Sequence, residues 1–184
     1  MLRSSLPSAA KKIVWNIKYG LLGYGHLEAP TNAIQYVRDN VDDASAILEL
    51  GCGWGSMLRA LRKTGCMSYY CGVDIAGRAI EVARGHGDQR SAWVVSDIES
   101  FRSPFRWKAI LLIESVYYIH IQQLPSVLSR LRDMLVDDGF ILVRIHDTAQ
   151  HQEYVRALER LAPGGCKIDS TLYGIPRSGL SAEN

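Results

Sequence analysis

Acidic side chains lie at or near the ends of successive apolar segments of this chain. Glu49 belongs to the apolar run 47–50, and Asp74, Asp97 and Glu114 each follow a later run. Parallel strands present their carboxyl ends at one edge of a sheet, so we expect these carboxylates to share a rim. An acid such as Glu49 is a poor neighbour for phosphate and a good one for an ammonium group. The pattern therefore favours a cationic nucleoside without phosphate as the ligand.

Three alternate glycines follow the first of these runs, in Gly51-Cys52-Gly53-Trp54-Gly55. Glycines at a strand end let the backbone turn sharply and approach a ligand closely. The spacing is G-x-G-x-G, whereas a dinucleotide-binding loop requires G-x-G-x-x-G. A purely structural turn between a strand and a helix is the alternative interpretation.

Residues 49–55 resemble motif I of the class I S-adenosylmethionine-dependent methyltransferases, whose loop wraps the amino-acid part of the cofactor. Asp74 lies 23 residues after Gly51 and resembles the acid of motif II, which accepts hydrogen bonds from ribose hydroxyls. Its alternative role is to cap the next helix. Asp97 and Ile98 resemble motif III, in which the acid meets the adenine amino group and the apolar residue stacks on the ring.

The resemblance covers residues 45–145 well and implies a set of cofactor-binding residues. That set consists of Glu49, Gly51, Cys52, Gly53, Trp54, Gly55, Asp74, Ile75, Asp97, Ile98 and Glu114.

Residues 113–119 are similar to the Glu-x-x-Tyr-Tyr pattern of the nodulation-type and related small-molecule N-methyltransferases. The candidate catalytic residues are Glu114, Tyr117, Tyr118, His120 and Tyr19. Methyl transfer requires chiefly that the nucleophile and the methyl carbon are held in line, so a strong base is optional for an amine. The candidate bases, where the acceptor needs one, are His120, His26 and Glu114. Tyr117 and Tyr118 could instead be core or surface aromatics. His146 and Asp147 are a further polar pair, too isolated to indicate a metal site.

Alternating apolar runs and amphipathic segments predict an α/β fold, a Rossmann-like class I methyltransferase sheet with helices on both faces and abbreviated C-terminal strands. We expect residues 1–44 to form a helical cap or lid and residues 45–184 the cofactor-binding core. Predicted strands cover residues 46–50, 68–73, 92–95, 108–113, 140–145 and 167–172, and predicted helices cover residues 11–19, 32–40, 76–84, 124–135 and 154–161, with another beginning at Ser56. Thr31 is expected to cap the second helix. Little chain remains for an antiparallel seventh strand.

A chain of 184 residues with 47% hydrophobic and 22% charged residues suits one globular domain, and no apolar run is long enough to span a bilayer. The net charge of +2 does not require a polyanionic partner, so we expect neither nucleic acid nor membrane as a partner. The four cysteines lack C-x-x-C spacing, which predicts neither a metal site nor a disulfide framework and favours a reduced, cytoplasmic protein. The basic N-terminal segment leaves a transit peptide as a less favoured alternative.

These patterns predict an S-adenosylmethionine-dependent methyltransferase acting on a small molecule, more at nitrogen than at oxygen, as a monomer or homodimer. The alternatives are a non-catalytic cofactor-binding partner subunit and a nicotinamide-dependent oxidoreductase.

Overall fold

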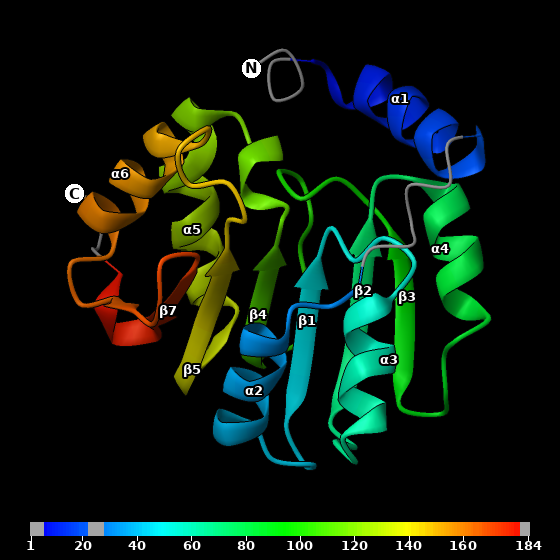
Figure 1. Cartoon of the computed structure of the whole chain (residues 1–184), viewed down its shortest axis with the longest axis horizontal. Helices are drawn as coiled ribbons and strands as arrows, with labels where there is room; N and C mark the ends of the chain where they lie inside the picture. The colour runs from blue at the N-terminus through cyan, green and yellow to red at the C-terminus, as the bar shows by residue number, and fades with distance from the viewer. Residues whose placement is uncertain (1–5, 22–27, 181–184) are drawn as a thin grey trace.

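The computed structural model describes residues 6–21 and 28–180 of the chain (Figure 1). Its helices are α1 (Ser8–Leu21), α2 (Thr31–Asn40), α3 (Ser56–Lys63), α4 (Gly77–Arg84), α5 (Leu124–Asp133) and α6 (Gln152–Leu161), with short 3-10 turns at Val116–Tyr118, Ile121–Gln123 and Arg177–Gly179. Its strands are β1 (Ala46–Leu50), β2 (Tyr69–Asp74), β3 (Ser91–Val95), β4 (Trp107–Ile113), β5 (Leu135–Arg144), β6 (Cys166–Lys167) and β7 (Leu172–Pro176).

These strands form a single sheet in the order β3-β2-β1-β4-β5-β7-β6. The first five strands in this order are parallel, and β7 runs antiparallel to both β5 and β6. In the centre, Leu48 of β1 lies between Cys71 of β2 and Ile110 of β4. The predicted Rossmann-like fold class is confirmed.

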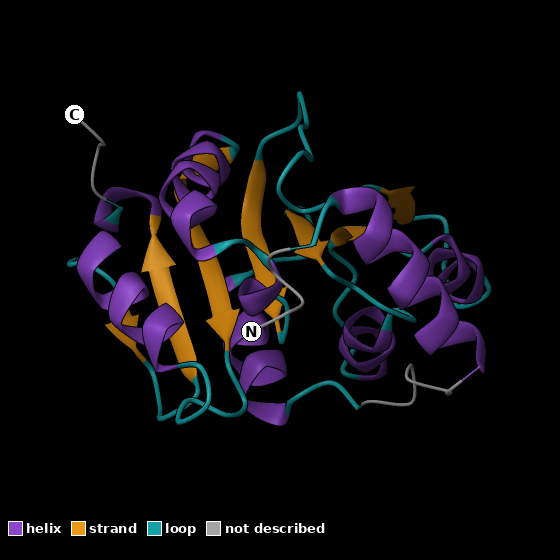
Figure 2. Cartoon of the chain, turned by 90° about the horizontal axis from the view of Figure 1, so that it is seen from above, coloured by secondary structure: helices purple, strands orange, loops and turns teal. Residues whose placement is uncertain are grey.

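Helices cover both faces of the sheet because the central strands are apolar on both sides (Figures 1 and 2). Leu48 and Ile110 point into a core shared with α5 and α6. The alternate residues Ile47 and Leu111 point into the core shared with α2 and α3. Successive residues of one strand thus bury against different helices, and this fixes the register of the strand, since a shift by one residue would exchange the two faces.

The C-terminal part of the sheet differs from the sequence-based expectation. The strand predicted at residues 167–172 is only the two-residue β6, and an antiparallel seventh strand does form, as β7. A short turn makes this possible, because the Asp169 carboxylate accepts hydrogen bonds from the backbone amides of Thr171 and Leu172, at 2.7 and 3.0 Å. The chain therefore reverses within four residues and leaves enough length for β7.

Two smaller expectations are also corrected. The N-cap of α2 is Pro30, and no side chain caps this helix end, so Thr31 is the first helical residue and does not cap the helix. The strand predicted at residues 140–145 begins earlier, because β5 starts at Leu135, and its pairing with β4 shifts register between Trp107 and Ala109.

A substitution in β2 tests the packing at the glycine-loop side of the sheet. A Cβ atom on Gly72 would lie 2.5 Å from the Trp93 ring and 2.9 Å from the Cys52 sulfur. We expect Gly72→Ala to lower the free energy of unfolding by about 1–3 kcal/mol through overpacking. Gly77→Ala is the matched control, because nothing lies within 4 Å of the added atom. Urea denaturation measures both, and an unchanged midpoint for Gly72→Ala would contradict the packing.

Candidate active site

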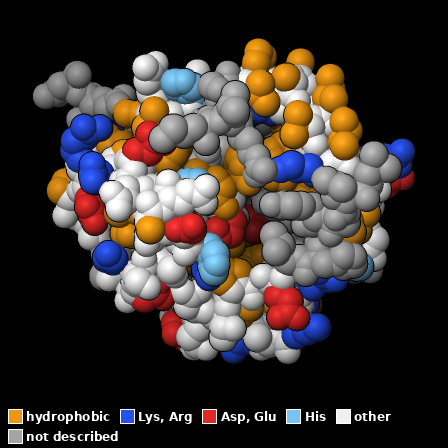
Figure 3. Space-filling view, turned by 45° about the horizontal axis from the view of Figure 1, so that its top comes forward, with side chains coloured by type: hydrophobic (Ala, Val, Ile, Leu, Met, Phe, Trp, Pro, Cys, Tyr) orange, Lys and Arg blue, Asp and Glu red, His pale blue; other side chains and the backbone are white. Residues whose placement is uncertain are grey.

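A cavity of about 1240 Å³ lies over the carboxyl ends of the parallel strands. Its walls come from α1, the segment before α2, the glycine loop, the end of β4 and the connection from β5 to α6. Figure 3 shows acidic side chains gathered at this hollow. Open α/β sheets bind ligands in the crevice outside these strand ends, so the position alone marks a binding site.

The glycine loop forms the floor of the cavity and requires glycine at its turns. Gly51, Gly53 and Gly55 have φ values of 84°, 53° and 73°, in the left-handed region that other residues seldom adopt. A Cβ atom on Gly51 would also lie 2.5 Å from the Cβ atom of Ser115. The Ser115 hydroxyl donates to the Leu50 carbonyl at 2.6 Å, so the loop is held against the end of β4. Gly55 does not line the cavity and instead precedes α3.

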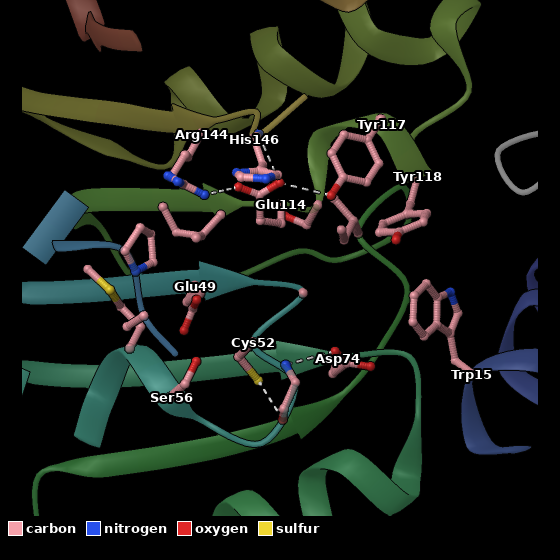
Figure 4. A pocket seen from close by; sticks show the side chains of 18 of the residues that line it. Trp15, Glu49, Cys52, Ser56, Asp74, Glu114, Tyr117, Tyr118, Arg144 and His146 are labelled. Carbon is pink, nitrogen blue, oxygen red and sulfur yellow. Dashed lines mark hydrogen bonds and ion pairs between the residues drawn. The ribbon is translucent and has the colours of Figure 1, made fainter. Parts of the chain in front are cut away.

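Asp74 connects the end of β2 to the glycine loop (Figure 4). Its Oδ2 accepts a hydrogen bond from the Gly53 amide at 3.0 Å, and its Oδ1 accepts one from the Ala76 amide at 2.8 Å. The N-cap of α4 is Ala76, so the alternative capping role does not describe Asp74. Burial raises the pKa of Asp74 to about 6, although the backbone hydrogen bonds lower it. A carboxylate at this position has lone pairs left for hydroxyl groups of a ligand.

Glu49 lies deeper in the same cavity and is 4% exposed. The hydroxyl of Tyr70 donates a hydrogen bond to its Oε2. Burial raises the pKa of Glu49 to about 8, while the Tyr70 hydrogen bond lowers it and the charge of Asp74 raises it further. The described structure thus places two buried carboxyl groups in one cavity with raised pKa values, an arrangement typical of ligand and active sites.

Glu114 begins the opposite wall and has the only left-handed backbone among the described non-glycine residues, with a φ of 55°. Its Oε1 forms an ion pair with Arg144. Its Oε2 accepts hydrogen bonds from the Tyr117 hydroxyl and the His146 amide, both at 3.0 Å. All of these groups come from the ends of β4 and β5, so Glu114 joins the two strand ends.

The predicted tyrosines Tyr117 and Tyr118 both line the cavity. The Tyr117 ring stacks on His151 with ring centroids 4.1 Å apart and an angle of 7° between the planes. Tyr118 packs edge-on against Tyr117 and against Trp15 of α1, in both cases at 4.8 Å. Side chains from the end of β4, from the start of α6 and from α1 therefore form one aromatic wall.

Helix α1 closes the cavity over the nucleoside side predicted for Asp74 and Asp97. The Tyr19 hydroxyl lies close above the glycine loop, since a Cβ atom added to Gly53 would be 3.0 Å from its oxygen. Burial is the main cause that raises the pKa of Tyr19 above its usual range. The Ser8 hydroxyl hydrogen-bonds the Asp97 carboxylate. Lys11 pairs with Glu99 at 2.9 Å. These contacts hold α1 against the cavity. That residues 1–44 form a cap or lid remains a prediction.

The structure does not bring every predicted residue to the cavity. His120 does not line it; the His120 Nδ1 atom accepts a hydrogen bond from the Gln122 amide at 3.3 Å and caps a 3-10 turn. His26 lies outside the described residues. The cofactor-side residues Cys52, Trp54, Ile75, Asp97 and Ile98 do line the cavity, as does the pair His146 and Asp147.

Several cavity residues were not found from the sequence, among them Trp15, Arg144 and His151. Arg144 could have been found, because it lies one residue before the end of the predicted strand 140–145, at the same sheet edge as Glu114. His151 offers no such signal, since it reaches the cavity only through the path of the chain between β5 and α6.

Two further findings concern only the part of the chain that the structure describes. No cluster of His, Cys, Asp or Glu in it has the arrangement of a metal site. None of its helices is long and apolar enough to cross a membrane.

The sheet order, the glycine loop and the acidic rim define a cofactor-binding α/β domain of the Rossmann-like class. Residues 26–170 match a family model described as a methyltransferase domain, so the chain belongs to the methyltransferase domain family. The predicted resemblance to class I S-adenosylmethionine-dependent methyltransferases is confirmed.

Known proteins with similar sequences or folds agree with this family. The N-methyltransferase NodS from Bradyrhizobium japonicum, solved with S-adenosyl-L-homocysteine, aligns with a TM-score of 0.63 and 18% identity over 79% of this chain and 84% of that one. A putative methyltransferase solved with the Haloferax volcanii Trm112 activator aligns with a TM-score of 0.68 and 17% identity over 97% and 100% of the two chains. At these identities the likeness concerns the fold.

A curated relative is the ribosomal protein L11 methyltransferase of Caldanaerobacter subterraneus subsp. tengcongensis, 27% identical over 77% of this chain. The match covers 47% of that relative, so this chain spans less than half of its length.

The raised pKa of Glu49 predicts a particular dependence of stability on pH. The folded protein holds the Glu49 proton up to about pH 8, whereas the unfolded chain releases it near the ordinary value of 4.5. Stability from this group is therefore complete below about pH 4.5 and is lost as the pH rises toward 8, by on the order of 1 kcal/mol per pH unit. We expect Glu49→Gln, which cannot ionise, to lose less stability over this range than the wild type.

Denaturation series between pH 5 and pH 8.5 measure this difference. Glu81→Gln is the control, because the Glu81 side chain is 69% exposed and lies on the surface of α4. Parallel pH curves for the wild type and Glu49→Gln would contradict the buried, protonated state of Glu49.

Proposed function

We propose that this protein is an S-adenosylmethionine-dependent methyltransferase that methylates a nitrogen atom of a small molecule. The observation that carries the proposal is the charge of the cavity. Seven carboxyl side chains line it among the described residues, against two basic side chains, Lys11 and Arg144. Both basic groups are already ion-paired with carboxylates, with Glu99 and Glu114 respectively. An acidic cavity favours a cationic cofactor and a basic acceptor.

The residues present fit the cofactor. The left-handed turns of the glycine loop allow a ligand to approach the backbone closely. Glu49 offers a carboxyl group for the ammonium of the amino-acid part, and Asp74 offers one for the ribose hydroxyls. Asp97 and Ile98 line the same cavity and are the residues we assign to adenine.

When bound, the cofactor supplies a methyl group on a sulfonium, which an amine takes with its lone pair while the carbon–sulfur electron pair stays on the neutral thioether. The chain's contribution is to exclude water, to orient the amine and to stabilise the positive charge that develops on the amine nitrogen. The product ammonium then loses one N–H proton to solvent. No strong base is needed for this step when the amine arrives neutral, which suits a site whose Glu114 carboxylate is held by three partners.

Other functions make different predictions. An amine of a protein is the alternative acceptor, since a curated relative is a ribosomal protein methyltransferase. A non-catalytic, cofactor-binding partner subunit is a further alternative, and it would bind the cofactor without turning over any acceptor. A nicotinamide-dependent oxidoreductase would need a loop for the pyrophosphate, and the acids near Gly53 oppose that charge.

A panel of acceptors tests the proposal. Purified protein is incubated with S-adenosylmethionine and with small amines, phenols, alcohols or a lysine-containing peptide, and formation of S-adenosylhomocysteine is measured. We expect turnover with small amines. Asp74→Asn should weaken cofactor binding about tenfold, the cost of about one charged hydrogen bond. Asp137→Asn, at an exposed position near the start of β5, should leave cofactor binding unchanged.

Each outcome of the panel has a defined meaning. Failure to bind S-adenosylmethionine at millimolar concentration would overturn the proposal as a whole. Binding with turnover of the peptide alone, or of phenols and alcohols alone, would overturn the assignment of a small amine. Binding without any turnover supports the partner subunit.

A further inference from the structure

The hydroxyl group of Tyr117 has a fixed polarity in this cavity. It donates its proton to Oε2 of Glu114 at 3.0 Å, as the dashed line in Figure 4 marks. The other oxygen of Glu114 is ion-paired with Arg144. A carboxylate paired with a guanidinium accepts hydrogen bonds and donates none. The single proton of Tyr117 is therefore committed to Glu114.

The backbone of Glu114 supports the same arrangement. Its φ of 55° lies in the left-handed region, which is strained for a residue with a side chain. Such strain persists where the surroundings determine the conformation, and here three groups hold the carboxylate, namely Arg144, the His146 amide and Tyr117. The strained turn directs the carboxylate between the end of β5 and the Tyr117 hydroxyl (Figure 4).

The Tyr117 ring is fixed as well as its hydroxyl. His151 covers one face of the ring at 4.1 Å, and Tyr118 packs edge-on at 4.8 Å. Burial, followed by the charges of Tyr118 and Glu114 and by hydrogen bonds to the same two residues, raises the pKa of Tyr117 above its usual range. Tyr117 therefore keeps its proton at neutral pH and cannot act as a base.

A hydroxyl oxygen has one proton and two lone pairs. With its proton given to Glu114, the Tyr117 oxygen has only lone pairs left and can therefore only accept a further hydrogen bond. A neutral primary or secondary amine can donate an N–H to this oxygen and keep its own lone pair for the methyl group. A neutral tertiary amine has no N–H to donate and would leave the oxygen unpaired in the cavity.

We propose that Tyr117, held by Glu114 and Arg144, is a specificity-determining residue that accepts a hydrogen bond from the N–H of the acceptor, so that the enzyme methylates primary and secondary amines and stops at the tertiary amine. This inference rests on the proposed function and names the class of amine. Glu114 and Arg144 are positioning residues, because they act through Tyr117. A site that hydrogen-bonds its substrate discriminates strongly against an analogue lacking the donor.

The test uses one acceptor amine in three forms, primary, N-methyl and N,N-dimethyl, with the products identified by mass spectrometry. We expect the wild type to methylate the first two forms and to give no quaternary product. Tyr117→Phe should raise KM for the secondary amine at least tenfold, leave the dissociation constant of S-adenosylmethionine unchanged and allow quaternary product to form. Glu114→Gln should raise the same KM, because it loses the ion pair with Arg144.

Two readouts separate positioning from other roles. The pH profile of kcat/KM should follow the pKa of the amine in the wild type and in Tyr117→Phe alike, whereas loss of a general base would remove the acid limb in the variant. Tyr69→Phe is the control for loss of a hydroxyl, because Tyr69 is 51% exposed at the start of β2, and it should behave as the wild type. Thermal midpoints show that the variants are folded.

The possible failures differ. Quaternary product from the wild type, or an unchanged KM and amine preference in Tyr117→Phe, would overturn this inference and leave amine methylation standing. A wild type that binds the cofactor and methylates none of the three amines, while methylating a phenol or a peptide, would overturn the proposed function and this inference with it.

Discussion

The hydrogen bonds of the Asp74 carboxylate are the interaction on which the site depends. The glycine loop must turn through three left-handed residues to leave β1, and the bond from the Gly53 amide to Asp74 fixes where that turn lies relative to β2. The second bond, from the Ala76 amide, fixes the start of α4 at the same point. One side chain thus holds a loop, a strand end and a helix start together, and β1 and β2 keep their parallel register behind it.

Desolvation without a basic partner is the second constraint. Glu49 and Asp74 are buried, and burial is the main cause of their raised pKa values. Folding alone gains nothing from placing two such groups in one cavity, because each buried charge costs free energy unless it is paired. A cationic ligand that enters the cavity would provide the partner that these two carboxyl groups lack in the folded protein alone. On the opposite wall the carboxylate is paired, because Glu114 forms an ion pair with Arg144. Glu114 also holds Tyr117 and the His146 amide in place.

The sequence predicted those parts of the protein that periodicity and strand-end chemistry determine. Apolar runs located β1 to β4, and the acids that follow them converge because parallel strands share an edge. Features set by tertiary contacts escaped prediction. The hairpin before β7 depends on the hydrogen bonds of Asp169, and the position of His151 depends on how α6 packs. His120 is a residue of the right type in the segment that follows β4, yet its ring caps a local turn. The left-handed φ of Glu114 has no signature in residue type, since glutamate seldom adopts it.

The most direct test of the account is a titration of ¹⁵N-labelled protein with S-adenosylhomocysteine, followed by backbone amide resonances. The account predicts that the amides of Gly53, Ala76 and Ser115, which come from three separate strand ends, shift along one common binding curve, while Tyr69 and Asp138 at the opposite edge of the sheet stay in place. Shifts confined to the opposite edge, or no shift at millimolar ligand, would contradict it.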